Sequence, residues 1–138
     1  MIYVDTSLLL PAYVPEANSD LANSVLEASS PIVISDLTVA EFRVGLARKV
    51  KLGILTIPQA EVVRATFDSH LAEGRLQRHT LRPSHSEAAG DLAWSSTVML
   101  RTLDALHLAV AMSLAAPLAT FDGRLADAAR AFSWKVLP

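Results

Sequence analysis

The stretch PIVISDLTVAEFRVGLARKVKLG, residues 31–53, joins a short apolar run to a longer periodic one. Its first five residues are rich in β-branched side chains, which predicts a strand over 31–35. Apolar side chains then recur at helical spacing, at Val39, Phe42, Leu46 and Val50. This periodicity predicts a helix over 36–53, and Gly53 suits its C-terminal end. A strand that passes directly into a helix is the repeating unit of an α/β fold.

The same alternation continues along the chain on both sides of this unit. Further strands are predicted over 2–4, 76–81, 117–121 and 134–137. Helices are predicted over 17–29, 58–74, 84–96, 103–116 and 123–132. Strands that alternate with helices imply a parallel sheet between helical layers. We therefore predict a single domain over residues 1–138 with an α/β fold, a three-layer α/β/α sandwich around a central, mainly parallel sheet of about four or five strands.

The composition excludes several classes of function. The chain has 138 residues, 51% of them hydrophobic, which is enough for one enclosed core. Its formal net charge of −2 argues against a broadly basic nucleic-acid-binding surface but permits a local one. Because the chain has no cysteine, disulfides, thiolate zinc sites and a cysteine nucleophile are excluded.

No targeting or membrane-spanning segment is predicted. The N-terminal run lacks the basic region that opens a signal peptide, and Pro11 interrupts its apolar residues. The apolar segment 103–119 is too short for a spanning helix and contains Asp104 and Pro117. We expect a cytoplasmic protein without a membrane contact.

Four acidic residues are expected at the carboxyl edge of the predicted sheet, where the sites of open α/β folds usually form. They are Asp5, Glu41, Asp104 and Asp122. Asp5 and Asp122 follow strands directly, and Glu41 lies in the first turns of a helix that follows a strand. Asp104 opens the helix that returns the chain to the start of strand 117–121, so that helix must begin at the carboxyl edge. The four carboxylates should therefore converge.

Each of these acids also has a purely structural explanation. Asp5 and Asp122 could cap helices, because carboxylate oxygens accept hydrogen bonds from the free N–H groups at a helix start. Glu41 would close a capping box with Thr38, and Asp104 lies in a first helical turn. Capping explains each acid singly, but four caps at one edge of one sheet favour a shared function.

Four neighbouring carboxylates need compensating charge. Two ionised carboxylates about 5 Å apart repel each other by roughly 3 kcal/mol at an effective dielectric constant of about 20. Helix N-termini offset part of this repulsion, and Arg101 or Arg124 could each pair with one acid. A hard divalent cation such as Mg²⁺ or Mn²⁺ compensates more fully, because these ions prefer oxygen ligands. The pattern therefore predicts a metal site built from carboxylates.

Four segments together resemble the motifs of PIN-domain nucleases, most closely those of the VapC-type toxins of bacterial toxin–antitoxin pairs. They are VDTSLLL (4–10), LTVAEFRVGL (37–46), LRTLDALHLAVA (100–111) and LATFDGRLADAA (118–129). The resemblance implies a PIN-like fold and a Mg²⁺- or Mn²⁺-dependent endoribonuclease. The acidic quartet of the family matches Asp5, Glu41, Asp104 and Asp122.

The resemblance also extends to residues around the quartet. Hydroxyl groups beside the first and last acids match the family at Thr6 or Ser7 and at Thr120, with capping as their alternative role. The segment TFDGRL (120–125) departs from the Thr-Asn or Thr-Asp form common in the last motif, so Asp127 is an alternative to Asp122. His107 shares a helix face with Asp104. A single histidine at that spacing is expected to be hydrogen-bonded or packed, and is not assigned as a metal ligand.

The implied reaction is hydrolysis of an RNA phosphodiester by metal-activated water. Asp5 and Asp104 would be the main metal ligands. The other two acids would bind the metal directly, bind it through water or orient the nucleophile. By resemblance, the products carry 5′-phosphate and 3′-hydroxyl ends, and a 2′,3′-cyclic phosphate would count against this mechanism.

Three kinds of partner are implied. RNA would be held through its phosphates, and the candidate basic residues are Arg43, Arg48, Lys49, Lys51, Arg75, Arg78 and Arg82. Each of them is otherwise an ordinary solvated side chain. The resemblance further implies a cognate VapB-type antitoxin protein and a homodimer. Segments 7–14 and 53–57 are apolar enough to contact the antitoxin, or to be buried in the core of the domain itself.

Three alternative functions fit parts of the pattern. A phospho-acceptor receiver-like signalling domain shares the sheet and the acidic edge. By resemblance, however, such a domain has a pair of adjacent aspartates where this chain has only Asp5. A phosphatase with an aspartate nucleophile needs a second aspartate two residues later, where this chain has Ser7. A PIN-like binding module without turnover is the third alternative, although it would leave four acids without a chemical role.

Overall fold

The computed structural model describes all residues 1–138 and has a five-stranded sheet at its centre. The strands are β1 (Ile2–Val4), β2 (Ile32–Ser35), β3 (Leu76–His79), β4 (Leu118–Ala119) and β5 (Val136–Leu137). Their spatial order is β3-β2-β1-β4-β5, and every neighbouring pair is parallel. β1 is therefore the central strand, with β2 on one side and β4 on the other. The predicted fold class is confirmed, with five strands and no antiparallel pair.

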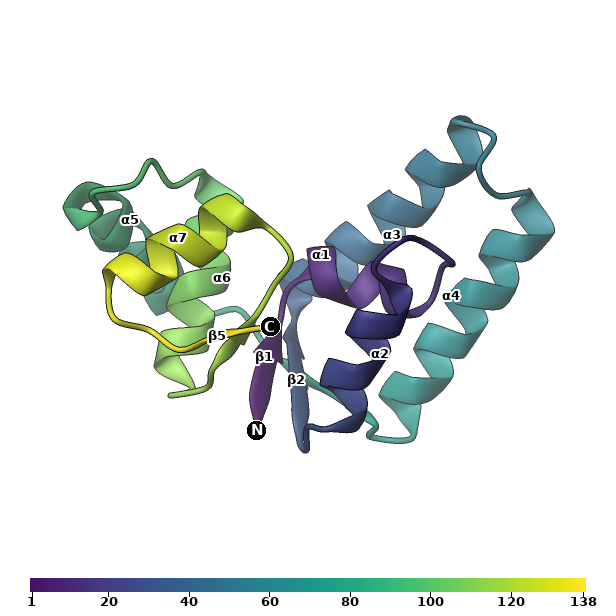
Figure 1. Cartoon of the computed structure of the whole chain (residues 1–138), viewed down its shortest axis with the longest axis horizontal. Helices are drawn as coiled ribbons and strands as arrows, with labels where there is room; N and C mark the ends of the chain where they lie inside the picture. Colours follow the sequence, from purple (N-terminus) through teal and green to yellow (C-terminus); the bar gives the residue numbers. More distant parts are fainter.

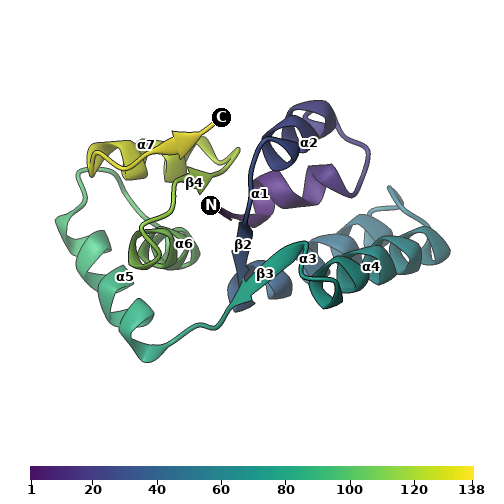
Figure 2. The same cartoon turned by 90° about the horizontal axis from the view of Figure 1, so that it is seen from below.

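Helices cover both faces of the sheet (Figure 1 and Figure 2). One layer holds α1 (Thr6–Leu9), the short 3-10 helix η1 (Leu10–Ala12), α2 (Ser19–Glu27), α3 (Asp36–Lys51) and α4 (Ile57–Ala72). The other layer holds α5 (Pro83–Ser95), α6 (Thr102–Ser113) and α7 (Gly123–Ala131). No helix combines the length and the apolarity that crossing a membrane requires.

Alternate side chains of the central strands enter two separate cores, because successive side chains of a strand point to opposite faces. Ile2 and Val4 join the core under α1 to α4, whereas Tyr3 joins the core under α6 and α7. β2 divides in the same way, with Ile34 in the first core and Val33 in the second. All five side chains are buried, so the sheet is enclosed on both faces.

The strand predicted over 117–121 is shorter than expected and is limited to Leu118–Ala119. The N–H groups of Phe121 and Asp122 donate to Ser7 Oγ instead of to a neighbouring strand. The backbone therefore leaves the sheet early and turns toward α7. The other predicted elements are present, with ends shifted by a few residues.

Candidate active site

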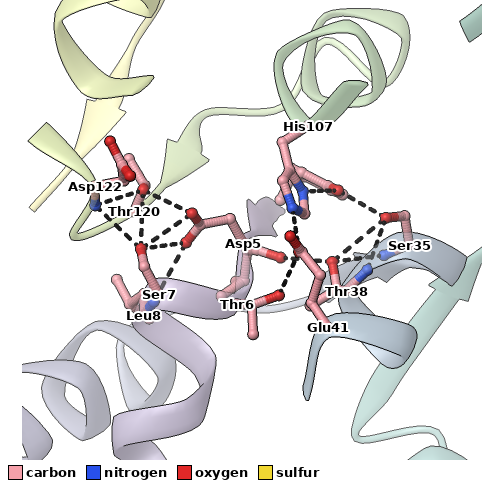
Figure 3. Close-up of polar contacts among 12 residues, drawn as sticks. Asp5, Thr6, Ser7, Leu8, Ser35, Thr38, Glu41, His107, Thr120 and Asp122 are labelled. Carbon is pink, nitrogen blue, oxygen red and sulfur yellow. Dashed lines mark hydrogen bonds and ion pairs between the residues drawn. The ribbon is translucent and has the colours of Figure 1, made fainter. Parts of the chain in front are cut away.

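The four acidic residues come from four different segments that meet at the carboxyl edge of the sheet. Asp5 follows β1, Asp122 follows β4, and Glu41 lies in α3, which follows β2. Figure 3 shows these three among a group of hydroxyl side chains. Asp104 lies in the first turn of α6, which leads into β4, and the charges of both Asp122 and Glu41 act on it. The topology thus brings together acids that are as far apart in sequence as positions 5 and 122.

Asp5 is almost fully buried and has several hydrogen-bond donors. It is the N-cap of α1 and accepts from Leu8 N–H at 3.3 Å. Ser7 Oγ donates to Asp5 Oδ1 at 2.8 Å, and Thr120 Oγ1 donates to Oδ2 at 2.9 Å. Burial raises the pKa of Asp5, because the charged form loses hydration, while His107 and the hydroxyl donors act in the opposite direction.

The two hydroxyls that hold Asp5 also fix the position of Asp122. Ser7 Oγ and Thr120 Oγ1 accept from Asp122 N–H at 3.1 and 2.9 Å. Asp122 is the N-cap of α7, and its Oδ1 accepts from Leu125 N–H at 2.9 Å. Its Oδ2 has no hydrogen-bond partner. The capping roles expected for Asp5 and Asp122 are therefore confirmed. Capping uses only one carboxylate oxygen, Oδ1, of each residue.

Asp127, the alternative to Asp122, lies outside this group. Its side chain is exposed on α7, where it pairs with Arg130 at 3.4 Å. The structure places Asp122 beside Asp5 and leaves Asp127 in solvent.

Glu41 lies well inside α3 and takes no part in capping it. The expected capping box of Thr38 and Glu41 is wrong, because α3 begins at Asp36 and its N-cap is Ser35. Ser35 Oγ accepts from Thr38 N–H at 3.4 Å, and Thr38 Oγ1 accepts from Ser35 N–H at 3.3 Å. The end of β2 at Ser35 therefore sets the start of α3, and the capping box lies three residues earlier than the predicted one.

The carboxylate of Glu41 is held by donors from two other elements. Thr6 Oγ1 donates to Glu41 Oε2 at 2.7 Å, and His107 Nε2 lies 2.7 Å from the same oxygen. Burial acts to raise the pKa of Glu41, but the hydrogen bond and charge of His107, together with Thr6, outweigh it. The pKa of Glu41 therefore lies below its ordinary value.

His107 is buried and hydrogen-bonded on both ring nitrogens, as expected for a histidine that packs beside the site. Its Nδ1 lies 2.7 Å from the hydroxyl of Tyr3, which in turn lies 2.8 Å from Ser35 Oγ. Tyr3 and Ser35 were not predicted as site residues. The only signal for Tyr3 in the sequence was a polar hydroxyl within the short apolar strand 2–4, which needs a hydrogen-bond partner when it is buried. The fold is required to identify that partner as His107.

Asp104 is the one acid of the four that accepts no hydrogen bond from the protein. Burial is the largest cause of its raised pKa, and the negative charge of Asp122 is the next. Glu41 adds to this effect, while His107 and Arg101 oppose it. Asp104 therefore lies in a negative environment that His107 and Arg101 offset only in part.

Comparison with known proteins assigns the chain to a family. The family model described as PIN domain matches residues 2–131, which is nearly the whole chain. The chain belongs to the PIN-domain family. A relative, Ribonuclease VapC46 from Mycobacterium tuberculosis (strain ATCC 25618 / H37Rv), is 32% identical over 139 residues, covering 99% of this chain and 95% of the relative.

Two solved structures share the fold of this PIN domain at lower identity. One is the crystal structure of Mycobacterium tuberculosis VapC20, a sarcin-ricin loop cleaving toxin. It is 18% identical, has a TM-score of 0.74, and the match covers 93% of this chain and 95% of VapC20. The other is a toxin–antitoxin complex from Klebsiella pneumoniae, with 22% identity, a TM-score of 0.65, and coverage of 89% of this chain and 92% of that one.

The donor set of this PIN domain fits a hard divalent cation in its chemistry. Every candidate ligand is a carboxylate, and several oxygens have no protein partner: both of Asp104, Oε1 of Glu41 and Oδ2 of Asp122. As the side chains stand, no three acidic or histidine residues surround a common point where a metal ion would bind. A cation would therefore have to draw these carboxylates together, and the unneutralised charge at Asp104 favours that movement.

Most of the basic residues expected to contact RNA are engaged by acids. Four of the seven form ion pairs: Arg43 with Asp68, Lys49 with Glu16, Arg75 with Glu73 and Arg78 with Asp36. Arg48, Lys51 and Arg82 form none. Arg48 lines a groove of about 390 Å³ between α1 and α3, here called the α1–α3 groove, which Thr6 and Ser7 also line. This groove places one cation without an ion pair in the same surface as the two hydroxyl side chains that donate to Glu41 and Asp5.

The two segments expected to contact a partner differ in exposure. In segment 7–14, Leu8, Leu9 and Val14 are buried, so the core of the domain accounts for most of its apolar residues. In segment 53–57, Ile54 and Ile57 are 58% and 64% exposed, respectively. Only the second segment keeps a substantial apolar surface.

Proposed function

We propose that this PIN domain is a metal-dependent endoribonuclease that acts as the toxin of a toxin–antitoxin pair. The observation that supports this proposal best is the convergence of four carboxylates from four elements on one sheet edge. Three of them are fixed by protein donors, yet two of those three keep an oxygen without a partner, and Asp104 is unengaged. The name of the relative VapC46, a ribonuclease, supports RNA as the substrate.

The four acids divide the work of holding a metal. A bound Mg²⁺ or Mn²⁺ ion would supply a water of lowered pKa and stabilise charge on the phosphodiester oxygens. Asp5 and Asp104 are the proposed main ligands, and Glu41 and Asp122 bind directly or through water. Ser7 and Thr120 keep Asp5 in place by hydrogen bonds.

Substrate RNA is proposed to approach along the α1–α3 groove. Thr6 and Ser7 line this groove, and each donates a hydrogen bond to one of the acids. Arg48 is exposed in the same groove and forms no ion pair, so it is free to contact a phosphate. The net charge of −2 is consistent with a local contact of this kind in place of a broad basic surface.

A cognate VapB-type antitoxin is the proposed protein partner. The Klebsiella pneumoniae neighbour is a toxin–antitoxin complex, which supports a partner of this kind. Ile54, in the turn after α3, and Ile57, the first residue of α4, provide apolar surface for it. We also propose a homodimer and a cytoplasmic location, the second because the substrate is cellular RNA.

Cleavage of total cellular RNA by the purified, antitoxin-free chain tests the proposal. Reactions with Mg²⁺, Mn²⁺ or EDTA are compared with the same reactions of Asp104→Asn. Cleavage that requires metal, leaves 5′-phosphate ends and is lost in Asp104→Asn is the expected result. If the folded chain with metal leaves all RNA intact, the proposal of a general endoribonuclease is wrong, and the binding module without turnover takes its place.

A further inference from the structure

Both hydrogen-bond donors of Glu41 act on one of its two carboxylate oxygens. Thr6 Oγ1 and His107 Nε2 each lie 2.7 Å from Oε2, and Oε1 has no partner in the protein (Figure 3). A glutamate side chain has three rotatable bonds, and burying it costs rotamer entropy. Two donors on one oxygen remove that freedom while leaving the other oxygen available.

His107 is itself fixed more firmly than a surface donor would be. The ring is 3% exposed, and its second nitrogen bonds to the hydroxyl of Tyr3, which is fully buried in β1. The Tyr3 hydroxyl also bonds to Ser35, the N-cap of the helix that carries Glu41. The chain of contacts therefore starts at Glu41 in α3, passes through α6 and β1, and ends at the N-cap of α3.

The direction of the hydrogen bonds follows from the partners. The Glu41 carboxylate has no hydrogen to donate, so His107 Nε2 must carry one, whether or not the ring is charged. In the neutral ring Nδ1 then accepts from the Tyr3 hydroxyl, and Tyr3 accepts from Ser35. Every hydroxyl and ring nitrogen in the chain is satisfied in this arrangement, which fixes the plane of the imidazole.

We propose that His107, oriented by Tyr3, is a positioning residue that holds Oε2 of Glu41 so that Oε1 stays available to the metal. The inference rests on the proposed function, because it takes Glu41 to be a ligand. His107 does not touch metal or RNA in this arrangement. Partners that orient a metal ligand in this way typically change metal affinity by about 10-fold to 100-fold when they are removed.

Mn²⁺ titration of the full chain by calorimetry is the main test. His107→Leu removes the donor and is expected to weaken Mn²⁺ binding about 10-fold or more. His107→Gln, which restores an N–H donor, should recover most of the loss. Tyr3→Phe keeps the ring and removes only the hydroxyl, so we expect a smaller loss of about threefold and no difficulty in folding.

Two further variants separate positioning from general destabilisation. His85→Leu also removes a buried histidine with two hydrogen bonds, to Arg82 N–H and Ser113 Oγ, and should leave Mn²⁺ affinity unchanged. In a Glu41→Ala background, His107→Leu should cause no additional loss, because the residue it positions is gone. A folded His107→Leu or Tyr3→Phe variant with the Mn²⁺ affinity of the unaltered chain would overturn the inference.

NMR of the imidazole nitrogens without metal distinguishes this inference from the proposed function. A slowly exchanging Nε2–H resonance of His107 that disappears in Glu41→Ala is expected. If the unaltered chain binds no Mn²⁺, the proposed metal dependence fails, and with it the role of Oε1. If Mn²⁺ binds but the Nε2–H resonance is absent, the proposed function stands and the positioning role of His107 is wrong.

Discussion

Asp5 is the most enclosed of the four acids, and its charge depends on hydroxyl donors. Thr120→Val removes one of them and also an acceptor of Asp122 N–H. We expect the free energy of unfolding at pH 7 to fall by about 1–3 kcal/mol, because a buried carboxylate is left with fewer partners. Chemical denaturation measures the change. Thr66→Val, which removes an exposed hydroxyl on α4, should cost less than about 0.5 kcal/mol. Equal losses would contradict the prediction.

Asp104 differs from Asp5, because it accepts no hydrogen bond and forms no ion pair, and His107 and Arg101 offset its negative environment only in part. Asp104→Asn should lower RNA cleavage by about 100-fold or more, since a proposed main ligand is lost. The free energy of unfolding at pH 7 should rise by roughly 0.5 kcal/mol, because the cost of burying the charge and the repulsion from Asp122 are both relieved, although solvent screens much of the effect. Cleavage assays and denaturation curves measure the two effects. Asp127→Asn, an exposed acid on α7, is the matched control and should cleave normally. An Asp104→Asn protein that cleaves normally would contradict this assignment.

At the residue scale the sequence predicted which acids and hydroxyls gather at the sheet edge but not how they pair. The acids and the hydroxyls stand out because of their residue type and motif. That Thr6 serves Glu41, whereas Ser7 and Thr120 serve Asp5, depends on how α3 and β4 lie beside β1. Neighbours in sequence thus support different acids, and no local pattern records that choice.

At the scale of elements, the start of α3 shows what local patterns decide and what they leave open. Periodicity placed the helix correctly, but the Thr38–Glu41 match predicted the wrong capping box, and the structure has Ser35 with Thr38 instead. Asp36, the first helical residue, then binds beyond its own element, to Leu81 N–H at 2.9 Å and to Arg78 Nε at 2.5 Å. A contact between α3 and the segment after β3 requires the sheet order, which the alternation of elements alone does not specify.

The link made by Asp36 gives the start of α3 a pH dependence. The Leu81 N–H and then Arg78 hold the pKa of Asp36 below its ordinary value. A carboxyl with a depressed pKa in the folded state stabilises the protein above its unfolded pKa, and this stability is lost as the pH falls through the folded pKa. Asp36→Asn should therefore lower the free energy of unfolding at pH 7, by less than about 1 kcal/mol because the group is partly exposed and solvent screens its charge.

Denaturation curves of Asp36→Asn across the acid range measure this effect. The difference from the unaltered chain should shrink as the pH falls below the unfolded pKa of about 3.9, because Asp36 then becomes neutral like the asparagine that replaces it. Asp20→Asn, in the first turn of α2 and without a side-chain hydrogen bond, is the matched control. A difference that stays constant from neutral pH to pH of about 2 would show that Asp36 acts through packing and not through its charge.

At the scale of the whole molecule, the fold class followed from the alternation of strands and helices. The expected position of the acids followed from the rule that sites form at the carboxyl edge of the sheet. The electrostatic surface did not follow. Four of the seven basic residues considered for RNA turn out to be paired with acids, some of them on other elements, such as Arg43 on α3 with Asp68 on α4. A sequence supplies the number of charges, but ion pairing decides which of them remain available to a polyanion.

The α1–α3 groove is the surface where this distinction can be measured. Binding of single-stranded RNA is compared in the non-cleaving Asp104→Asn protein with and without Arg48→Ala, over a range of salt concentrations. Each lost phosphate contact to a single strand lowers the slope of log affinity against log salt by about 0.7. We expect that change for Arg48→Ala, together with weaker binding at low salt that is independent of RNA sequence. Arg64→Ala on α4 removes an equal charge outside the groove and should leave the slope unchanged, because a distant charge is screened beyond about 10 Å at 0.1 M salt. Equal slopes for the two variants would mean that RNA follows another path across the molecule.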